Sequence, residues 1–297
     1  MLHDFAGWPK GPLFLAIGVF DGVHLGHQAV VRATAETAHA AGATAVICTF
    51  DPLPIEVLAP SAPPSALTDI DERCRLLEGA GADAVAAIHF TRELSLRTPE
   101  QFVAALASAG EVRQIRVGED FRFGHDRAGN VAVLRELGPR YRFTLVVADA
   151  VTQGDRVVSS SRVRNALLAG DLAEAERLLG RRFTLRGDLA RGDPHGRALG
   201  YPSIDLAVAR NRLLPQDGIY AAWVATDRER VAAATSLSGD RRVELYLLDR
   251  PSTPLDGPVS VEFVRRIRDE LRFDSPAEAA AQIAKDVSET RKALAGG

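Results

Sequence analysis

Short apolar runs alternate with helical patterns along the first 150 residues of the chain. Apolar runs of this length, bounded by polar or turn residues, are typical of buried strands. They lie at 13–19, 44–49, 84–90, 113–117 and 143–147. Helical patterns separate them, at 27–41, from a capping box at 98–101 onward, and at 130–137. This alternation predicts a mostly parallel sheet with helices on both faces, and such sheets bind ligands beyond the carboxyl ends of their strands.

The pattern changes near Arg181, after which short strand candidates alternate with glycine and proline turns. No helical pattern interrupts this stretch, which predicts a small β-barrel or β-sandwich. The best strand candidates lie at 219–225, 230–234, 243–248 and 259–264, and a capping box at 275–278 opens a C-terminal helix. We therefore predict two domains: an α/β domain over 1–182, and a small β-barrel with a terminal helix over 183–297.

Composition narrows the possible functions. The length of 297 residues suits two domains, and 36 basic and 39 acidic residues leave a net charge of −3. Bulk charge therefore does not drive binding to nucleic acid, and no apolar stretch approaches the roughly 18 residues of a membrane span. Cys48 and Cys74 are too few for a disulfide framework or a zinc cluster. We expect a cytoplasmic protein with no nucleic-acid or membrane partner, and the oligomeric state stays open.

The sequence GVFDGVHLGH at residues 18–27 connects the first predicted strand to the first predicted helix. A helix N-terminus carries unpaired N–H groups and about half a positive charge, so it attracts phosphate. Gly22 and Gly26 let the backbone come close to a ligand. His24 and His27 are three residues apart and could donate hydrogen bonds to a phosphorus centre as charge builds in a transition state. The alternative is a pair of surface histidines beside a turn.

The pattern HxGH at 24–27 matches the signature of the nucleotidyltransferase superfamily. From about residue 11 to its end, the chain resembles the prokaryotic bifunctional riboflavin kinase/FMN adenylyltransferases, also called FAD synthetases. Three further motifs carry the resemblance of the first domain. They are TFDPLP at 49–54 (family TFxPxP), GEDFRFG at 118–124 with Arg127 and Gly129 (family GxDFxFGxxRxG), and SSSRVR at 159–164 (family ISSTxIR).

The resemblance implies a Rossmann-like nucleotidyltransferase domain and gives its residues roles. His24 and His27 are the implied catalytic residues. The implied ATP-binding residues are Gly18, Phe20, Asp21, Gly22, Gly26, Ser159, Ser160, Ser161 and Arg164. The implied flavin- and nucleotide-facing residues are Asp120, Phe121, Phe123 and Arg127. Taken alone, the serines are ordinary N-cap residues, Asp120 a turn residue, and the two phenylalanines core residues.

The implied reaction is adenylyl transfer from ATP to FMN, which gives FAD and pyrophosphate. The nucleophile is the FMN phosphate, a monoester whose second pKa is about 6, so it is mostly dianionic at neutral pH. No general base is then required. Catalysis would consist of positioning and charge stabilisation, with Mg²⁺ on the triphosphate.

A second constellation resembles the riboflavin kinase module. GDPHGRALGYPSID at 192–205 is similar to the family's glycine-rich stretch that leads to GRxLGFPTAN. The threonine and asparagine of that motif help to hold Mg²⁺ and phosphates, and Ser203 and Asp205 stand at the matching positions. VELYLLD at 243–249 resembles the strand whose glutamate is the general base on the ribityl hydroxyl of riboflavin, which gives that role to Glu244. A solvent-facing strand glutamate is the alternative.

Two departures from the family pattern concern this second module. Asp205 replaces a neutral amide by a carboxylate, which can bind Mg²⁺ but adds negative charge beside ATP. Between Val231 and Glu244 the chain is shorter than the family, whose longer segment carries NIGxxPT. We therefore expect FAD synthesis from the first domain and weak or absent phosphorylation of riboflavin to FMN by the second.

Four alternatives remain. The enzyme is fully bifunctional; the second module is a non-catalytic flavin-binding regulator; the first domain transfers a nucleotide to another phosphate ester; or the chain binds flavin or nucleotide without catalysis. The intact His24 and His27 argue against the last of these, and the presence of the second module argues against the third.

Overall fold

The computed structural model describes residues 1–63, 65–191, 203–248 and 257–296. It contains two compact units, Met1–Ser160 and Ser161–Gly297. The domain boundary predicted after residue 182 therefore lies inside the second compact unit. The predicted kinase-module motif at 192–205, apart from its last three residues, lies outside the described residues, as does Asp249. In the part of the chain that is described, no helix is long and apolar enough to cross a membrane.

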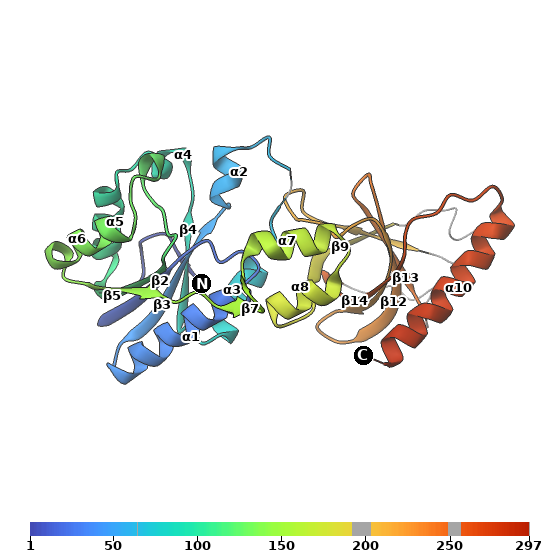
Figure 1. The fold of residues 1–297 in the computed structure, drawn as a ribbon, viewed down its shortest axis with the longest axis horizontal. Helices are drawn as coiled ribbons and strands as arrows, with labels where there is room; N and C mark the ends of the chain where they lie inside the picture. The colour runs from blue at the N-terminus through green and yellow to red at the C-terminus, as the bar shows by residue number, and fades with distance from the viewer. Residues whose placement is uncertain (64, 192–202, 249–256, 297) are drawn as a thin grey trace. The chain divides into compact units, whose positions relative to one another are not determined.

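The first unit is a parallel sheet covered by helices on both faces (Figure 1). Its strands pair in the order β1-β4-β3-β2-β5-β6. They are β1 (Leu2–His3), β2 (Pro12–Ile17), β3 (Thr44–Asp51), β4 (Ala84–His89), β5 (Glu111–Gly118) and β6 (Thr144–Ala148). The predicted α/β fold and its five strands are confirmed. The edge strand β1 was not predicted, because two residues are too few for a periodic pattern.

Five helices of the first unit begin after a residue whose side chain accepts an N–H of the first turn: His24, Asp69, Thr91, Thr98 and Asn130. The predicted capping box is present: the side chain of Thr98 accepts the N–H of Gln101, whose side chain accepts the N–H of Thr98. The helices are α1 (Leu25–Ala40), α2 (Pro54–Leu58), α3 (Ile70–Gly79), α4 (Arg92–Ser95), α5 (Pro99–Ala109), α6 (Val131–Tyr141) and the 3₁₀ helix η1 (His125–Arg127). A short hairpin, β7 (Thr152–Gln153) and β8 (Arg156–Val157), precedes the last motif.

Two hydrophobic layers flank the sheet. On one face Ala16, Ile47 and Val85 pack against α1 and α3, and on the other face Leu15, Cys48 and Ile88 pack against α5 and α6. Cys48 and Cys74 are both buried free thiols, as the sequence predicts for core residues.

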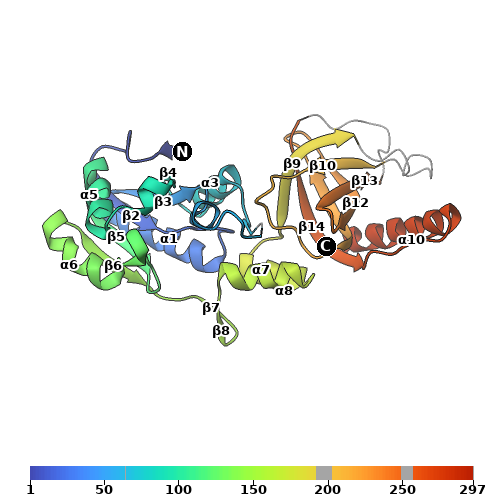
Figure 2. The same ribbon diagram turned by 90° about the horizontal axis from the view of Figure 1, so that it is seen from above.

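Strand β2 is the topological switch point of this sheet. The chain moves from β2 to β3 and β4 on one side, and then returns to β5 on the other side of β2 (Figure 2). Loops that leave the carboxyl ends of β2 and β5 therefore diverge at one place, where open α/β sheets bind ligands. The HxGH string follows β2 and the GEDFRFG string overlaps the end of β5, so the topology brings these motifs to one edge.

The second unit contains a closed antiparallel barrel, which decides between the predicted barrel and sandwich. Its strands pair in the order β10-β13-β12-β11-β14-β9. They are β9 (Thr184–Arg191), β10 (Ile204–Ala207), β11 (Gly218–Ala225), β12 (Arg230–Ser238), β13 (Arg242–Leu247) and β14 (Val259–Arg268). Three helices accompany them: α7 (Ser160–Leu168), α8 (Leu172–Leu179) and α10 (Pro276–Ala295).

The barrel interior is filled by alternate strand residues, and Tyr220 meets Phe263 edge-on with ring centroids 5.3 Å apart. Helix α10 lies outside, tied to β14 by the two-bonded ion pair of Arg268 and Asp286, at 2.9 and 2.6 Å. Its predicted cap is half confirmed. Ser275 accepts the N–H of Glu278, but the carboxylate of Glu278 accepts the N–H of Asp274.

Candidate active sites

His24 and His27 lie together at the N-terminus of α1. The helix begins at Leu25, so His24 is its N-cap, and the ring Nδ1 of His24 accepts the N–H of His27 at 3.3 Å. The two rings stack with centroids 3.6 Å apart and an angle of 19° between their planes. His24 is buried and His27 is half-buried. Helix N-caps are usually residues with a side-chain oxygen. A histidine at this position instead places a catalytic candidate at the positive end of the helix dipole.

The loop before α1 follows a left-handed path. Phe20, Gly22 and Val23 have φ values of +52°, +83° and +42°. A Cβ on Gly22 would stand 2.7 Å from Leu67 Cδ1, and a Cβ on Gly26 would stand 3.1 Å from Cε1 of His24. The two glycines that were predicted to let a ligand approach are therefore also needed for packing: Gly22 leaves space for Leu67, and Gly26 leaves space for the His24 ring.

Asp21, predicted to bind ATP, turns its carboxylate inward. It accepts the N–H groups of Leu67, at 2.9 Å, and Thr68, at 3.1 Å, and the hydroxyl of Thr68 donates to it at 3.2 Å. The Thr68 hydroxyl also accepts the N–H of Gly22 at 3.2 Å and Nε of Arg73 at 3.4 Å. The Asp21 carboxylate thus holds the HxGH loop against the segment that precedes α3.

Arg73 completes this buried network, and sequence reasoning missed it. Its guanidinium is 2% exposed and donates to the carbonyl of Phe50 at 2.8 Å and to the Thr49 hydroxyl at 3.3 Å. Burial lowers the pKa of Arg73, and the negative charges of Asp21 and Asp51 oppose that shift. The sequence signal that could have identified Arg73 is its place beside the apolar positions of the helical segment α3. The network connects the motif after β2 with the TFDPLP turn after β3.

The serines at 159–161 stand at the start of α7, as predicted. The hydroxyl of Ser160 donates to the carbonyl of Asp21 at 2.9 Å, so the last motif of the first domain contacts the first. Arg162 pairs with Glu174 at 2.6 Å and stabilises the α7–α8 pair. Arg164 belongs to the second compact unit, and its role toward ATP stays a prediction.

The loop after β5 divides the residues predicted to face flavin and nucleotide. Phe123 is buried against Phe102, with centroids 5.6 Å apart, and serves the core. Phe121 is half-buried and stacks on Phe123 at 5.3 Å. Asp120 and Arg127 are exposed. Of the four predicted residues, Phe121, Asp120 and Arg127 are therefore those that a ligand could reach.

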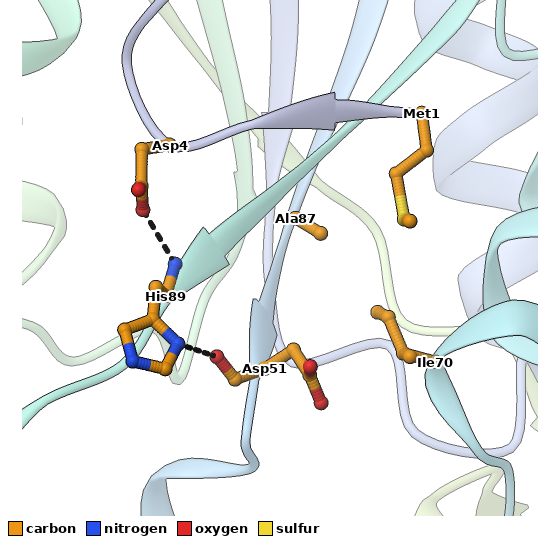
Figure 3. A pocket seen from close by; sticks show the side chains of 6 residues that line it. All are labelled: Met1, Asp4, Asp51, Ile70, Ala87 and His89. Atoms are coloured by element: carbon orange, nitrogen blue, oxygen red, sulfur yellow. Dashed lines mark hydrogen bonds between the residues drawn. The ribbon is translucent and has the colours of Figure 1, made fainter.

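A small cavity lies at the β1–β4–β3 edge, beside the TFDPLP turn (Figure 3). Its volume is about 80 Å³, enough for a few water molecules but far below the several hundred Å³ of a typical ligand pocket. In Figure 3, His89 connects two walls of the cavity. The backbone N–H of His89 donates to the Asp4 carboxylate at 2.8 Å, and the ring Nδ1 of His89 is hydrogen-bonded to the Asp51 carbonyl at 3.1 Å. The cavity is therefore too small for FMN or ATP.

The second unit brings the predicted kinase residues together on the outer face of the barrel. Asp205 on β10 is the direct cross-strand partner of Glu244 on β13. The hydroxyl of Ser203 donates to Glu244 Oε1 at 3.0 Å. A fourth residue, Arg242, was not predicted: its Nη2 lies 3.2 Å from Asp205 Oδ1 and 3.0 Å from Glu244 Oε1.

The segment that was expected to lack part of the kinase site forms regular paired strands. The chain from Val231 to Glu244 forms a β12–β13 hairpin whose strands pair from Ser238 opposite Arg242 to Ala233 opposite Leu247. The hairpin completes the barrel, so the shorter sequence does not interrupt the strand that carries Glu244.

The oxygen donors on this face fit Mg²⁺. The Ser203 hydroxyl donates its hydrogen to Glu244, which leaves its oxygen able to face a cation. The Asp205 carboxylate lies two residues later, in β10. Among the described residues, no cluster of three or more His, Cys, Asp or Glu could hold a metal ion by itself.

Two family models match the chain: FAD synthetase over residues 9–162 and riboflavin kinase over residues 179–294. The bifunctional riboflavin kinase/FMN adenylyltransferase of Escherichia coli strain K12 is 32% identical over 294 residues, covering 96% of this chain and 94% of that protein. The protein of the same name from Pseudomonas fluorescens is 33% identical over 299 residues, covering 98% and 95%.

A solved structure extends the likeness to the whole fold. The crystal structure of a protein described as a macrolide-efflux protein, from Streptococcus pneumoniae, has a TM-score of 0.84 at 28% identity. The match covers 96% of this chain and 95% of that one. Because the first family model spans more than half of the chain and the relatives align over nearly all of it, this chain belongs to the bifunctional riboflavin kinase/FMN adenylyltransferase family.

Proposed function

We propose that the chain is fully bifunctional: it phosphorylates riboflavin to FMN and then transfers AMP from ATP to FMN. The observation that carries the second step is the stacked pair of His24 and His27 at the N-terminus of α1. The first step is supported by the Ser203–Glu244 contact and by a riboflavin kinase match over the whole second module. The expectation of a weak or absent kinase rested on the shorter segment between Val231 and Glu244, and that segment forms the paired β12–β13 hairpin of the closed barrel.

Adenylyl transfer needs positioning and charge stabilisation. An oxygen of the FMN phosphate attacks the α-phosphorus of ATP, the bond from that phosphorus to the bridging oxygen breaks, and pyrophosphate leaves. His24 and His27 donate hydrogen bonds to the phosphoryl oxygens, where negative charge grows, and the positive end of α1 adds to their effect. The attacking phosphate is already deprotonated at neutral pH, so no side chain has to remove a proton.

We assign the remaining first-domain residues by position. Ser159, Ser160, Ser161 and Arg164 bind the β- and γ-phosphates at the start of α7, where free N–H groups and a planar cation suit them. Gly18, Phe20, Gly22 and Gly26 shape the loop that surrounds the nucleotide, while Asp21 keeps that loop in place through Thr68. Asp120, Phe121 and Arg127 face the flavin end, with Phe123 behind them. The catalytic domains are proposed to be 1–182 and 183–297.

In the kinase reaction Glu244 is the general base. Its carboxylate accepts the proton of the ribityl hydroxyl, whose oxygen attacks the γ-phosphorus of ATP while the bond to the bridging oxygen breaks and ADP leaves. Ser203 holds Glu244 in place through the 3.0 Å hydrogen bond and, with Asp205, supplies oxygen ligands for Mg²⁺. When bound, Mg²⁺ neutralises charge on the transferred phosphoryl group.

One assay separates the two activities. Purified full-length protein is given riboflavin or FMN separately, each with ATP and Mg²⁺, and the products are resolved by chromatography. We expect FMN and FAD from riboflavin, and FAD with pyrophosphate from FMN. Failure to form FMN from riboflavin would overturn the kinase half, and failure to form FAD from FMN would overturn the adenylyltransferase half.

A further inference from the structure

Two acidic side chains face each other across β10 and β13 of the barrel. Asp205 and Glu244 occupy directly opposed positions, and Ile204 is paired with Leu245 in the same register. Cβ atoms of opposed residues in an antiparallel pair lie about 5 Å apart, and like charges there destabilise the sheet. Asp205 and Glu244 are 28% and 27% exposed, so water screens them only partly. The arrangement needs a counter-charge.

Arg242 supplies that charge from the same face. It lies two residues before Glu244 on β13, so the two side chains leave the strand on the same side. Its Nε and Nη2 donate to Asp205 Oδ1 at 3.3 and 3.2 Å, and Nη2 also reaches Asp205 Oδ2 at 3.3 Å. The same Nη2 lies 3.0 Å from Glu244 Oε1. One guanidinium therefore contacts both carboxylates.

We propose that Arg242 is a positioning residue of the kinase site, which neutralises Asp205 and fixes the orientation of Glu244. This inference rests on the proposed riboflavin kinase activity. The carboxylate of Asp205 would by itself repel the phosphates of ATP. Arg242 offsets that charge, so the Asp205–Arg242 pair presents a nearly neutral surface to the nucleotide. It also holds the Glu244 oxygen that the Ser203 hydroxyl contacts, so the base is fixed from two sides.

The contact between Arg242 and Asp205 predicts that substitutions of these two residues are energetically coupled. Arg242→Gln leaves Asp205 and Glu244 opposed without their shared cation, so we expect FMN formation to fall about tenfold, with a raised KM for ATP. Asp205→Asn in the Arg242→Gln background removes the excess charge but keeps a side-chain oxygen that can face Mg²⁺, so it should restore most of the lost activity. Thermal unfolding of the nucleotide-free protein provides a second readout: Arg242→Gln should lower the melting temperature, and the added Asp205→Asn should raise it again.

The same chain contains two controls. Arg228→Gln makes the same change at an exposed position of the barrel, in the β11–β12 turn, and should leave both readouts at the wild-type level. FAD formation from added FMN reports on the first domain and should not change in the Arg242 variants.

The outcomes separate this inference from the proposed function. A wild-type protein that makes no FMN from riboflavin overturns both. A wild-type protein that makes FMN, together with an Arg242→Gln variant that keeps full activity, overturns the role of Arg242 alone. Equal losses in Arg242→Gln and in the double variant, in activity and melting temperature, would also overturn it, since removing the Asp205 charge would then restore nothing.

Discussion

The imidazole of His24 accepts the backbone N–H of His27 and lies face to face with the His27 ring, 3.6 Å away between centroids. The residue that ends the loop thus also orients the residue in the first helical turn. Both rings stand where the dipole of α1 is positive and where the β2 and β5 loops diverge. The two imidazole rings are therefore held in position before any substrate binds. The proposed mechanism requires such preorganised hydrogen-bond donors.

Replacing either histidine should impair FAD synthesis far more than folding. His24→Ala and His27→Ala are each expected to lower the rate of FAD formation from FMN by about 10²–10³, the usual effect of removing one transition-state donor. His24→Ala should also lose about 1 kcal/mol of stability, because the helix loses its cap. Rates are measured by chromatography and stability by denaturant unfolding. His39→Ala, at the exposed end of the same helix, is the control and should keep full activity. Near-normal rates in both test variants would contradict the assignment.

Gly26 tests whether the position of the His24 ring matters. The Cβ of Gly26→Ala would lie 3.1 Å from Cε1 and 3.2 Å from Nδ1 of His24, so the ring must shift while its hydrogen bond to His27 resists. We expect a loss of kcat for FAD formation with little change in the melting temperature. Gly79→Ala makes the same change in α3, where nothing lies within 4 Å, and should stabilise the protein by up to about 1 kcal/mol without affecting kcat. Equal kcat values in the two variants would show that the ring position is not critical.

The Thr68 hydroxyl is the junction between Asp21, Gly22 and Arg73. Thr68→Val keeps the shape of the side chain but removes all three hydrogen bonds in a buried site, which should cost about 1–3 kcal/mol of unfolding free energy. FAD formation should fall as well, because Gly22 belongs to the HxGH loop. Thr68→Ser retains the hydroxyl and should preserve most of the activity. Urea unfolding and the FAD assay check both variants, and wild-type stability in Thr68→Val would contradict the role given to this network.

Neither cysteine should respond to thiol reagents while the protein is folded. Burial raises the pKa of Cys74 to about 11 and raises that of Cys48 further, compared with about 8.5 for a free thiol. The reactive thiolate is therefore scarce at pH 8, and access is blocked as well. Iodoacetamide labelling followed by mass spectrometry should find both thiols unmodified in the native protein and both modified in denaturant. FAD synthesis should persist after treatment of the native protein. Rapid labelling of Cys74 in the native state would show that the β1 edge opens.

Local signals explain what could be predicted. Apolar runs and helical patterns arise from neighbouring residues, so five strands of the sheet and the helix after the HxGH string followed from the sequence. The carboxyl edge of the sheet was also predicted as the place where a ligand binds, because parallel sheets bind ligands there. β1 could not be predicted, because its two residues pair with Ala86 and Ala87 far along the chain.

Long-range contacts explain the rest. The motif that contains Asp21 suggested an ATP ligand, yet its carboxylate contacts backbone groups 46 and 47 residues away. Arg73 belongs to no motif, and its burial depends on the turn after β3. Arg242 becomes meaningful only in the register that opposes Asp205 and Glu244. Each of these roles requires a pairing that one local segment does not encode.

Ser203 and Glu244 allow the kinase activity to be tested within an intact enzyme. Glu244→Gln keeps the size of the side chain and removes the proton acceptor, so FMN formation from riboflavin should fall by about 10²–10⁴, the range attributed to general base catalysis. Ser203→Ala should cause a smaller loss of kcat and a stronger requirement for Mg²⁺, because the Ala side chain neither holds Glu244 nor offers an oxygen ligand.

Ser203→Thr distinguishes these chemical effects from disturbed packing. Threonine retains the hydroxyl and adds a methyl group at a half-buried position, so we expect it to keep most of the wild-type rate. Chromatography of the riboflavin reaction gives the rates, and FAD formation from FMN in the same preparations shows whether the first domain is intact. If Glu244→Gln forms FMN as fast as the wild type while the barrel remains folded, the proton is accepted elsewhere. The outward-facing carboxylate would then be an ordinary strand residue, because alternation along β13 places it on that face in either case.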